Sequence, residues 1–245
     1  SMDPQTVTQV SANQLVYAIY DPLVWMLVVD GKTQIFPGLA ESWEVSDDLT
    51  EYTFHLREAD FHDGTPFNAD SVKYMLDRIQ DPNLEAGLAQ GSLGKAYESS
   101  EVIDDRTVKV VFSSPNGGFL TALGSPKLLI PSPTAVEALG ADFALNPVGT
   151  GPFKFVEFAD QQYVRLVRND NYAWGPAALG SGAVEIGELE FRVLTDPIAQ
   201  VNAVRTGEID IAHSPPLSVQ NLGGLEAEGF VVLRGATRGA PFSYI

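Results

Sequence analysis

The chain has 245 residues, enough to bury a core as one large domain or two small ones. Hydrophobic residues make up 44% of it and aromatic residues 10%, as in an ordinary globular protein, and no apolar run reaches the ~18 residues needed to span a membrane. The net charge of −17 argues against a nucleic-acid partner, because phosphate binding requires clustered Lys and Arg. The absence of cysteine excludes disulfides, thiolate metal sites and a cysteine nucleophile.

The first half of the chain contains two predicted strands and a predicted helix. Residues 51–57 alternate between apolar and polar positions, which predicts a strand that buries Tyr52, Phe54 and Leu56. Asn68 can cap a helix whose apolar residues share one stripe, formed by Val72, Met75, Leu76 and Ile79. Residues 107–112 alternate in the same way, with a predicted buried face formed by Val108, Val110 and Phe112.

The second half continues the same mixture of strands and helices. A Ser-Pro pair at 132–133 begins a short predicted helix that Gly140 ends. An Asp-Pro pair at 196–197 begins another, which carries a stripe of Ile198, Val201 and Val204 and ends at Gly207. Strands are predicted at 153–158, 163–168 and 189–193. Because no regular βαβ repeat is present, the pattern indicates a mixed α/β (α+β) fold.

Four groups of motifs cover almost the whole chain. They are YDPLV at 20–24 with FPGLAESW at 36–43, YTFHLR at 52–57 with FHDGTPFNADSV at 61–72, PVGTGPF at 147–153 with RNDNY at 168–172, and GEIDI at 207–211. In this order and spacing they resemble the family 5 extracellular solute-binding proteins, the dipeptide, oligopeptide and nickel receptors of ABC transporters. Asn68 stands where the family usually has Thr, and Asp21 where Glu is commoner, but Asn keeps the oxygen that caps a helix.

The resemblance implies the first lobe of a two-lobed receptor of the periplasmic-binding-protein type II class. Members of the family are about twice as long as this chain, so we expect the second lobe to lie outside this sequence, which we interpret as truncated. On the family's pattern, residues 1–37 and 148–245 form one discontinuous subdomain with a mixed sheet. Residues 38–147 form a second subdomain, inserted into the first.

The resemblance also implies a function. The protein is expected to be the substrate-binding component of an ABC importer, which captures a peptide or similar small solute in the cleft between lobes and delivers it to the permease. It is expected to be a monomer without a cofactor, located in the periplasm or on the cell surface as a lipoprotein, with membrane contact only through a lipid anchor or the permease. The identity of the ligand is not predicted.

Eight residues are candidates for ligand binding, because the resemblance places them on loops or strand ends at the cleft. They are Tyr17, Tyr20, Asp21, Trp25, Ser125, Lys127, Thr150 and Phe242. Aromatic rings there could stack on a ligand, and Lys127 could bind a carboxylate. The competing interpretation is structural, with Tyr17, Tyr20 and Trp25 in the core and Lys127 as a solvated surface charge.

Other functions find less support in the sequence. The lobe could be the ligand-sensing domain of a transcriptional regulator. A hydrolase is less favoured, because no G-x-S-x-G motif is present and the acidic pairs at 47–48 and 104–105 have the character of turns. His55, His62 and Asp63 could suggest a metal site, but His55 lies on the polar face of its strand. A turn at 62–64, with Asp63 bound to backbone N–H groups, is the favoured interpretation.

Overall fold

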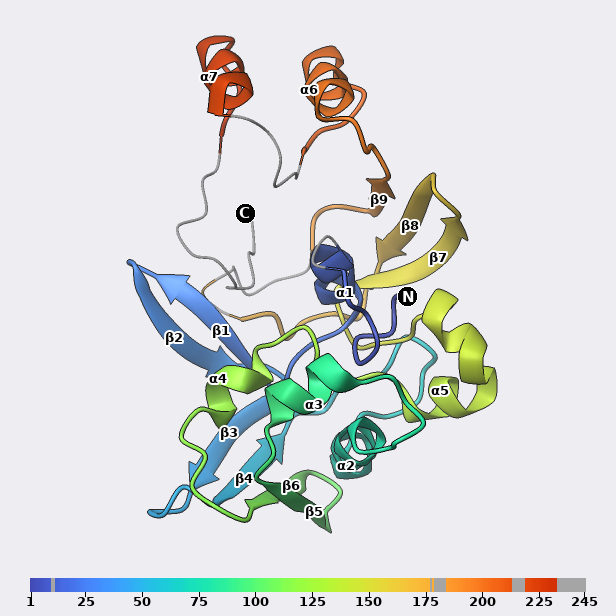
Figure 1. Ribbon diagram of the computed structural model, residues 1–245. Helices are drawn as coiled ribbons and strands as arrows, with labels where there is room; N and C mark the ends of the chain where they lie inside the picture. Colours follow the sequence, from blue (N-terminus) through green and yellow to red (C-terminus); the bar gives the residue numbers. More distant parts are fainter. Residues whose placement is uncertain (10–11, 177, 179–183, 213–218, 233–245) are drawn as a thin grey trace.

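The computed structural model describes residues 1–9, 12–176, 178, 184–212 and 219–232, and it forms three antiparallel sheets with helices packed around two of them (Figure 1). The helices are α1 Asn13–Ile19, α2 Ala69–Ile79, α3 Gly87–Leu93, α4 Phe119–Leu123, α5 Pro133–Leu139, the 3₁₀ helix η2 Gly140–Leu145, α6 Pro197–Thr206 and α7 Val219–Ala227. The strands are β1 Val24–Val29, β2 Lys32–Pro37, β3 Ala40–Val45, β4 Glu51–Leu56, β5 Tyr97–Asp104, β6 Thr107–Phe112, β7 Phe153–Ala159, β8 Tyr163–Arg168 and β9 Glu188–Arg192.

The largest sheet has the strand order β3-β4-β6-β5. Its inner face is the alternating set predicted from the sequence, since Tyr52, Phe54 and Leu56 of β4 are at most 3% exposed. The antiparallel register places Tyr52 opposite Val110 and Phe54 opposite Val108, and both valines are fully buried. Cross-strand apolar pairs of this kind fix the register, because a slip of one residue would turn every apolar side chain outward.

Helix α2 packs against this sheet and begins at the predicted cap. The Asn68 Oδ1 atom accepts a hydrogen bond from the Ser71 backbone N–H at 3.0 Å, and the Ser71 hydroxyl lies 3.4 Å from the Asn68 backbone nitrogen. Together these bonds form a capping box. The predicted stripe is confirmed, because all four of its apolar residues are fully buried, namely Val72, Met75, Leu76 and Ile79.

The two helices that begin with a cap followed by proline are also confirmed. In α6 the Asp196 carboxylate accepts a hydrogen bond from the Ala199 N–H at 2.8 Å, and Gly207 ends the helix with a φ of +70°. The predicted buried stripe of α6 is only partly present, however. Val201 is buried, whereas Ile198 is 66% exposed, because no described element of the chain covers that side of the helix.

The described residues form two hydrophobic cores. One lies between the β3-β4-β6-β5 sheet and helices α2, α3 and α4, and the other lies among α1, α5, η2, β7 and β8. The chain contributes residues to both cores in turn. Leu23 belongs to the first core and Leu129 to the second. The subdomain boundaries, 1–37 with 148–245 and 38–147, stay a prediction.

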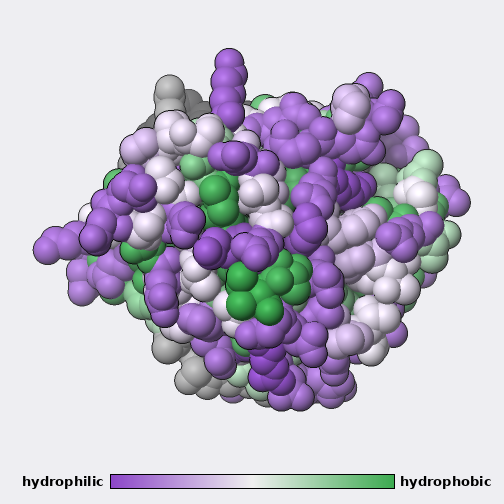
Figure 2. Space-filling view, turned by 90° about the horizontal axis from the view of Figure 1, so that it is seen from below, coloured by the Kyte–Doolittle hydropathy of each residue, from purple (hydrophilic) through white to green (hydrophobic). Residues whose placement is uncertain are grey.

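The surface of the protein is mainly hydrophilic on the face seen from below in Figure 2, with separate small apolar patches. Among the described residues, no helix combines the length and the apolar character that crossing a membrane would require.

Candidate functional site

Seven of the eight predicted ligand-binding residues lie in the described part of the chain, and Phe242 lies outside it. The structure places these seven in two regions. The first, which we call the aromatic wall, consists of Tyr17, Trp25 and Ser125, where α1, β1 and the end of α4 meet, with Lys127 nearby in the sequence. The second, which we call the junction, contains Tyr20, Asp21 and Thr150, where the two cores meet.

The aromatic wall is held together by one ring contact and one hydrogen bond. The Tyr17 and Trp25 rings lie with their centroids 5.8 Å apart at an angle of 33°. The Tyr17 hydroxyl donates to the Gly124 carbonyl at 2.6 Å, next to Ser125. Gly124 lies so close to β1 that a Cβ atom there would come within 2.7 Å of the Met26 Cβ. The packing therefore fixes the positions of α1, β1 and the end of α4 relative to one another.

Two polar atoms of this region lack a hydrogen-bond partner among the described residues. The Trp25 Nε1 is buried and unpaired, and Trp25 as a whole is only 6% exposed. The Asn13 Oδ1 is also buried and unpaired, and Asn13 lies one helical turn before Tyr17 on the same face of α1. Buried polar atoms are normally paired, so this donor and this acceptor are exceptions among the described residues. Asn13 was not singled out from the sequence, where its spacing of four from Tyr17 was the available signal.

Lys127 does not extend into solvent. Its ammonium group donates to the Val7 carbonyl oxygen, and the residue is only 9% exposed. Burial lowers the pKa of Lys127 from its ordinary value. The interpretation of Lys127 as a solvated surface charge is therefore wrong, because the side chain binds the N-terminal segment. A role in binding a ligand carboxylate stays a prediction.

The junction is built around the carboxylate of Asp21, which is fully buried. Its Oδ1 accepts a hydrogen bond from the Tyr172 hydroxyl at 2.9 Å, and its Oδ2 accepts from the Thr150 hydroxyl and the Trp174 Nε1, each at 2.9 Å. Burial raises the pKa of Asp21, while these three donors and the Arg57 charge oppose that rise. The donors come from segments more than 120 residues further along the chain, so Asp21 fastens the start of the chain to its later part.

Close backbone contacts complete the junction. A Cβ atom on Gly149 would lie 2.3 Å from the Ile19 carbonyl oxygen, and one on Gly151 would lie 2.6 Å from the Ile19 carbonyl carbon. Only glycine fits where two backbones approach so closely. Tyr20 is fully buried beside them, with its hydroxyl 3.3 Å from the Met2 carbonyl oxygen. The PVGTGPF motif thus packs directly on the YDPLV motif.

The FHDG motif joins the same junction. The His62 backbone N–H donates to the Gly149 carbonyl at 2.8 Å, and the His62 Nε2 lies 2.9 Å from the Gly151 carbonyl oxygen, which requires a protonated Nε2. Burial lowers the pKa of His62 to about 4, so the ring is neutral at pH 7. The predicted turn is confirmed, because Asp63 accepts hydrogen bonds from the backbone N–H and hydroxyl of Thr65.

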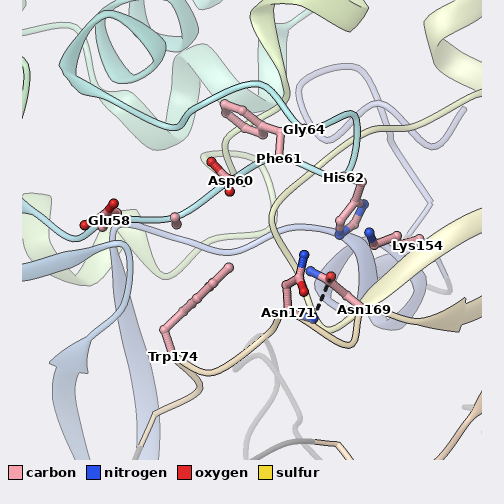
Figure 3. Close-up of a pocket in the computed structure, with 10 residues that line it drawn as sticks. Glu58, Asp60, Phe61, His62, Gly64, Lys154, Asn169, Asn171 and Trp174 are labelled. Carbon is pink, nitrogen blue, oxygen red and sulfur yellow. Dashed lines mark hydrogen bonds between the residues drawn. The ribbon is translucent and has the colours of Figure 1, made fainter.

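A recess of about 210 Å³ lies beside the junction (Figure 3). Residues 58–62 and Gly64 form one side of it, and Asn169, Asn171 and Trp174 form the other, with Lys154 beside His62. No group of three or more His, Asp or Glu residues that could hold a metal ion occurs among the described residues. The recess also lacks a serine, threonine or cysteine beside a base. It therefore offers polar and charged contacts.

The fold defines a class of protein, since the same architecture occurs in receptors solved with a bound solute. The periplasmic binding protein DppA from Helicobacter pylori, in complex with the peptide STSA, matches with a TM-score of 0.81 and 30% identity, over 93% of this chain and 46% of that one. MoaA from A. tumefaciens R10, in complex with mannopinic acid, matches with a TM-score of 0.82 and 28% identity, over 94% of this chain and 45% of that one.

The sequence comparisons agree. The family model of the bacterial extracellular solute-binding proteins, family 5, matches residues 34–240, and the chain belongs to this family. The glutathione-binding protein GsiB of Shigella flexneri is 32% identical over 88% of this chain and 40% of its own length. The protein of that name in Escherichia coli K12 is 31% identical over the same shares. The chain therefore spans less than half the length of these relatives, and the mixed α/β fold of one lobe is confirmed.

Proposed function

We propose that the protein is the solute-binding component of an ABC importer, which captures a small polar organic solute between this lobe and a second one. The observation that carries the proposal is the match, over more than nine tenths of this chain, to two receptors solved with a peptide and with mannopinic acid. Receptors of two lobes bind in the crevice between the lobes and close around the ligand. The chain on this proposal forms one side of the crevice.

The aromatic wall is the part of this lobe that we assign to the ligand. Tyr17 is half-buried and offers a ring face, Ser125 offers a hydroxyl, and Trp25 offers an indole N–H that no described residue accepts. Its three residues are uncharged, and the nearby Lys127 ammonium donates to the Val7 carbonyl. It is therefore suited to the neutral part of a solute, such as an amide or hydroxyl group.

The junction has a supporting role in the proposal. Asp21 and Thr150 bind each other, and Tyr20 packs beneath them, so these predicted ligand residues act by holding the strands that carry the aromatic wall. A direct contact between them and a ligand stays a prediction, as does one from Phe242. The proposal further includes an extracytoplasmic location, a permease as partner, a monomeric state and no enzymatic activity, in agreement with relatives that are named for binding.

The test uses the full-length protein encoded by the gene. Native mass spectrometry identifies any retained solute, and isothermal titration with glutathione, dipeptides, tetrapeptides and opines then measures the stoichiometry. We expect one solute bound per monomer. Absence of binding to every retained or added solute, or turnover of any of them, would contradict the proposal.

A substitution in the aromatic wall makes the test specific. Trp25→Phe keeps a ring and removes the indole N–H, which has no partner among the described residues. The smaller ring also leaves space in a buried site, so the apo protein should lose some thermal stability. Measured well below the thermal midpoint, the affinity for the solute should fall by up to about tenfold, as for the loss of one hydrogen bond. Trp43→Phe in β3, outside the wall, is the matched control and should leave the affinity unchanged.

A further inference from the structure

The recess beside the junction contains two opposite charges that do not pair with each other (Figure 3). Asp60 lines it from the segment between β4 and α2, and Lys154 lines it from β7. Among the described residues, neither side chain has an ion-pair or hydrogen-bond partner. The other carboxylate of the recess, Glu58, is bound to Arg106 at 2.9 Å. Asp60 and Lys154 are therefore the two charges of the recess that the described chain leaves unpaired.

Uncharged polar groups lie between these charges. The Asn171 side-chain amide makes no hydrogen bond to a described residue, although the Asn171 backbone N–H donates to the Asn169 Oδ1 at 3.3 Å. The His62 Nδ1 is buried and unpaired, and it is an acceptor because Nε2 carries the ring proton. The Lys154 ammonium lies beside this ring (Figure 3), and its three N–H donors can serve both Nδ1 and a ligand.

The Trp174 ring supplies the apolar part of the recess. Its position is fixed, because its indole N–H donates to Asp21 at 2.9 Å and its ring centroid lies 4.9 Å from that of Tyr172. A fixed ring beside charged groups suits the short hydrocarbon part of a small solute. The volume of about 210 Å³ also sets a limit, since pockets for drug-sized ligands begin at roughly 300 Å³. The recess therefore fits only a small molecule.

We infer that the recess is a binding site for a small zwitterion, a solute with one ammonium and one carboxylate group, such as a free amino acid. The ligand ammonium donates to the Asp60 carboxylate, and the ligand carboxylate accepts from Lys154 and from the Asn171 amide. Hydrogen bonds between charged groups are about twice as strong as those between neutral ones, so both ends of the ligand contribute. The site shares no residue with the aromatic wall, and the inference does not rest on the proposed function.

Ligand-detected NMR titration of the full-length protein tests the inference. The zwitterionic probes are glycine, β-alanine and 4-aminobutyrate, which differ in the distance between their charges. Butyrate and butylamine are the matched probes, because each lacks one of the two charges of 4-aminobutyrate. We expect at least one zwitterion to bind about tenfold more tightly than either matched probe. Equal binding of all probes, or binding of none, would overturn the inference.

Two substitutions assign the binding to the recess. Lys154→Met and Asp60→Asn should each weaken binding of the zwitterion by about tenfold. Lys154→Met should also abolish the preference for the zwitterion over butylamine, and Asp60→Asn the preference over butyrate. These preferences compare probes on one variant, so they do not depend on how much of it is folded. Lys32→Met and Asp160→Asn are the matched controls, since both residues are exposed and lie outside the recess.

The aromatic wall provides the last control. Trp25→Phe should leave the affinity for the zwitterion unchanged, whatever it does to the solute of the proposed function. Loss of zwitterion binding in Trp25→Phe, with none in Lys154→Met, would place the probe at the wall and overturn the inference. Failure of the proposed function would leave these results unaffected.

Discussion

Replacing Asp21 by alanine is the most informative perturbation of the junction. The carboxylate is fully buried and accepts three hydrogen bonds, from Thr150, Tyr172 and Trp174. Alanine removes the acceptor and leaves three donors without a partner, two of them on the buried residues Thr150 and Tyr172. The two hydroxyl groups can rotate toward other acceptors, but the Trp174 indole N–H cannot.

The magnitude follows from the unsatisfied donors. Each buried group left without a partner costs about 1–3 kcal/mol. The loss is offset in part, because the folded protein no longer holds a desolvated carboxylate, whose burial raises the pKa of Asp21. We therefore expect Asp21→Ala to lower the free energy of unfolding by about 3 kcal/mol, near the lower end of the range for three such groups.

Urea unfolding followed by tryptophan fluorescence measures this change, because Trp174 itself lies in the network. Asp160→Ala is the matched control, since Asp160 is an exposed carboxylate in the turn between β7 and β8, and its removal should change the unfolding free energy by less than about 0.5 kcal/mol. A change of the same small size for Asp21→Ala would refute the claim that Asp21 fastens the junction.

Three further predictions concern the junction. Burial lowers the pKa of His62 from 6.5 to about 4, so the neutral ring is favoured in the folded protein. The free energy of unfolding should therefore be highest above pH 6.5 and should fall by about 3 kcal/mol between pH 6.5 and pH 4. Urea unfolding of His62→Gln over the same pH range should lack this fall. The pKa of Asp21 is raised by burial, so protonation of Asp21 favours the folded protein. The free energy of unfolding of the wild type should therefore rise relative to that of Asp21→Asn as the pH falls toward 3.8. No such rise would contradict the burial of the Asp21 carboxylate. Gly149→Ala should lower the thermal midpoint sharply, since its Cβ would lie 2.3 Å from a carbonyl oxygen, whereas Gly87→Ala, with nothing within 4 Å, should not.

Elements whose signals are local could be predicted from the sequence. The alternation of β4 and β6, the cap at Asn68 and the proline starts of α5 and α6 each depend on residues within one element. The hairpin of β1 and β2 had a local signal too, because its turn residues Asp30 and Gly31 form the Asp-Gly pair that tolerates the observed φ values of 51° and 73°.

The junction and the wall could not be predicted in the same way, because their contacts join distant parts of the chain. Asp21 and Trp174 are 153 residues apart, and Lys127 and Val7 are 120 apart. Nothing in the neighbourhood of Lys127 indicates that its ammonium group binds a backbone carbonyl. The family motifs identified the segments that meet at the junction. The hydrogen bond between Asp21 and Thr150 becomes visible only in the folded structure.

The exposed stripe of α6 shows a third kind of limit. The sequence predicts a buried apolar stripe, and the helix forms with both predicted ends, yet Ile198 remains exposed. Periodicity reports which face of a helix is apolar, and it does not report what covers that face. The side of α6 that carries Ile198 is therefore the place where the sequence pattern and the described chain disagree.

The most direct measurement of the central claim is native mass spectrometry of the full-length protein combined with titration of the solute it carries. If the aromatic wall and an opposing lobe capture the solute, each monomer should carry one solute molecule. Unfolding should release that solute with unchanged mass, and Trp25→Phe should bind it more weakly. A protein that carries no solute and binds none of the offered peptides or opines, or that returns the solute chemically altered, would contradict it.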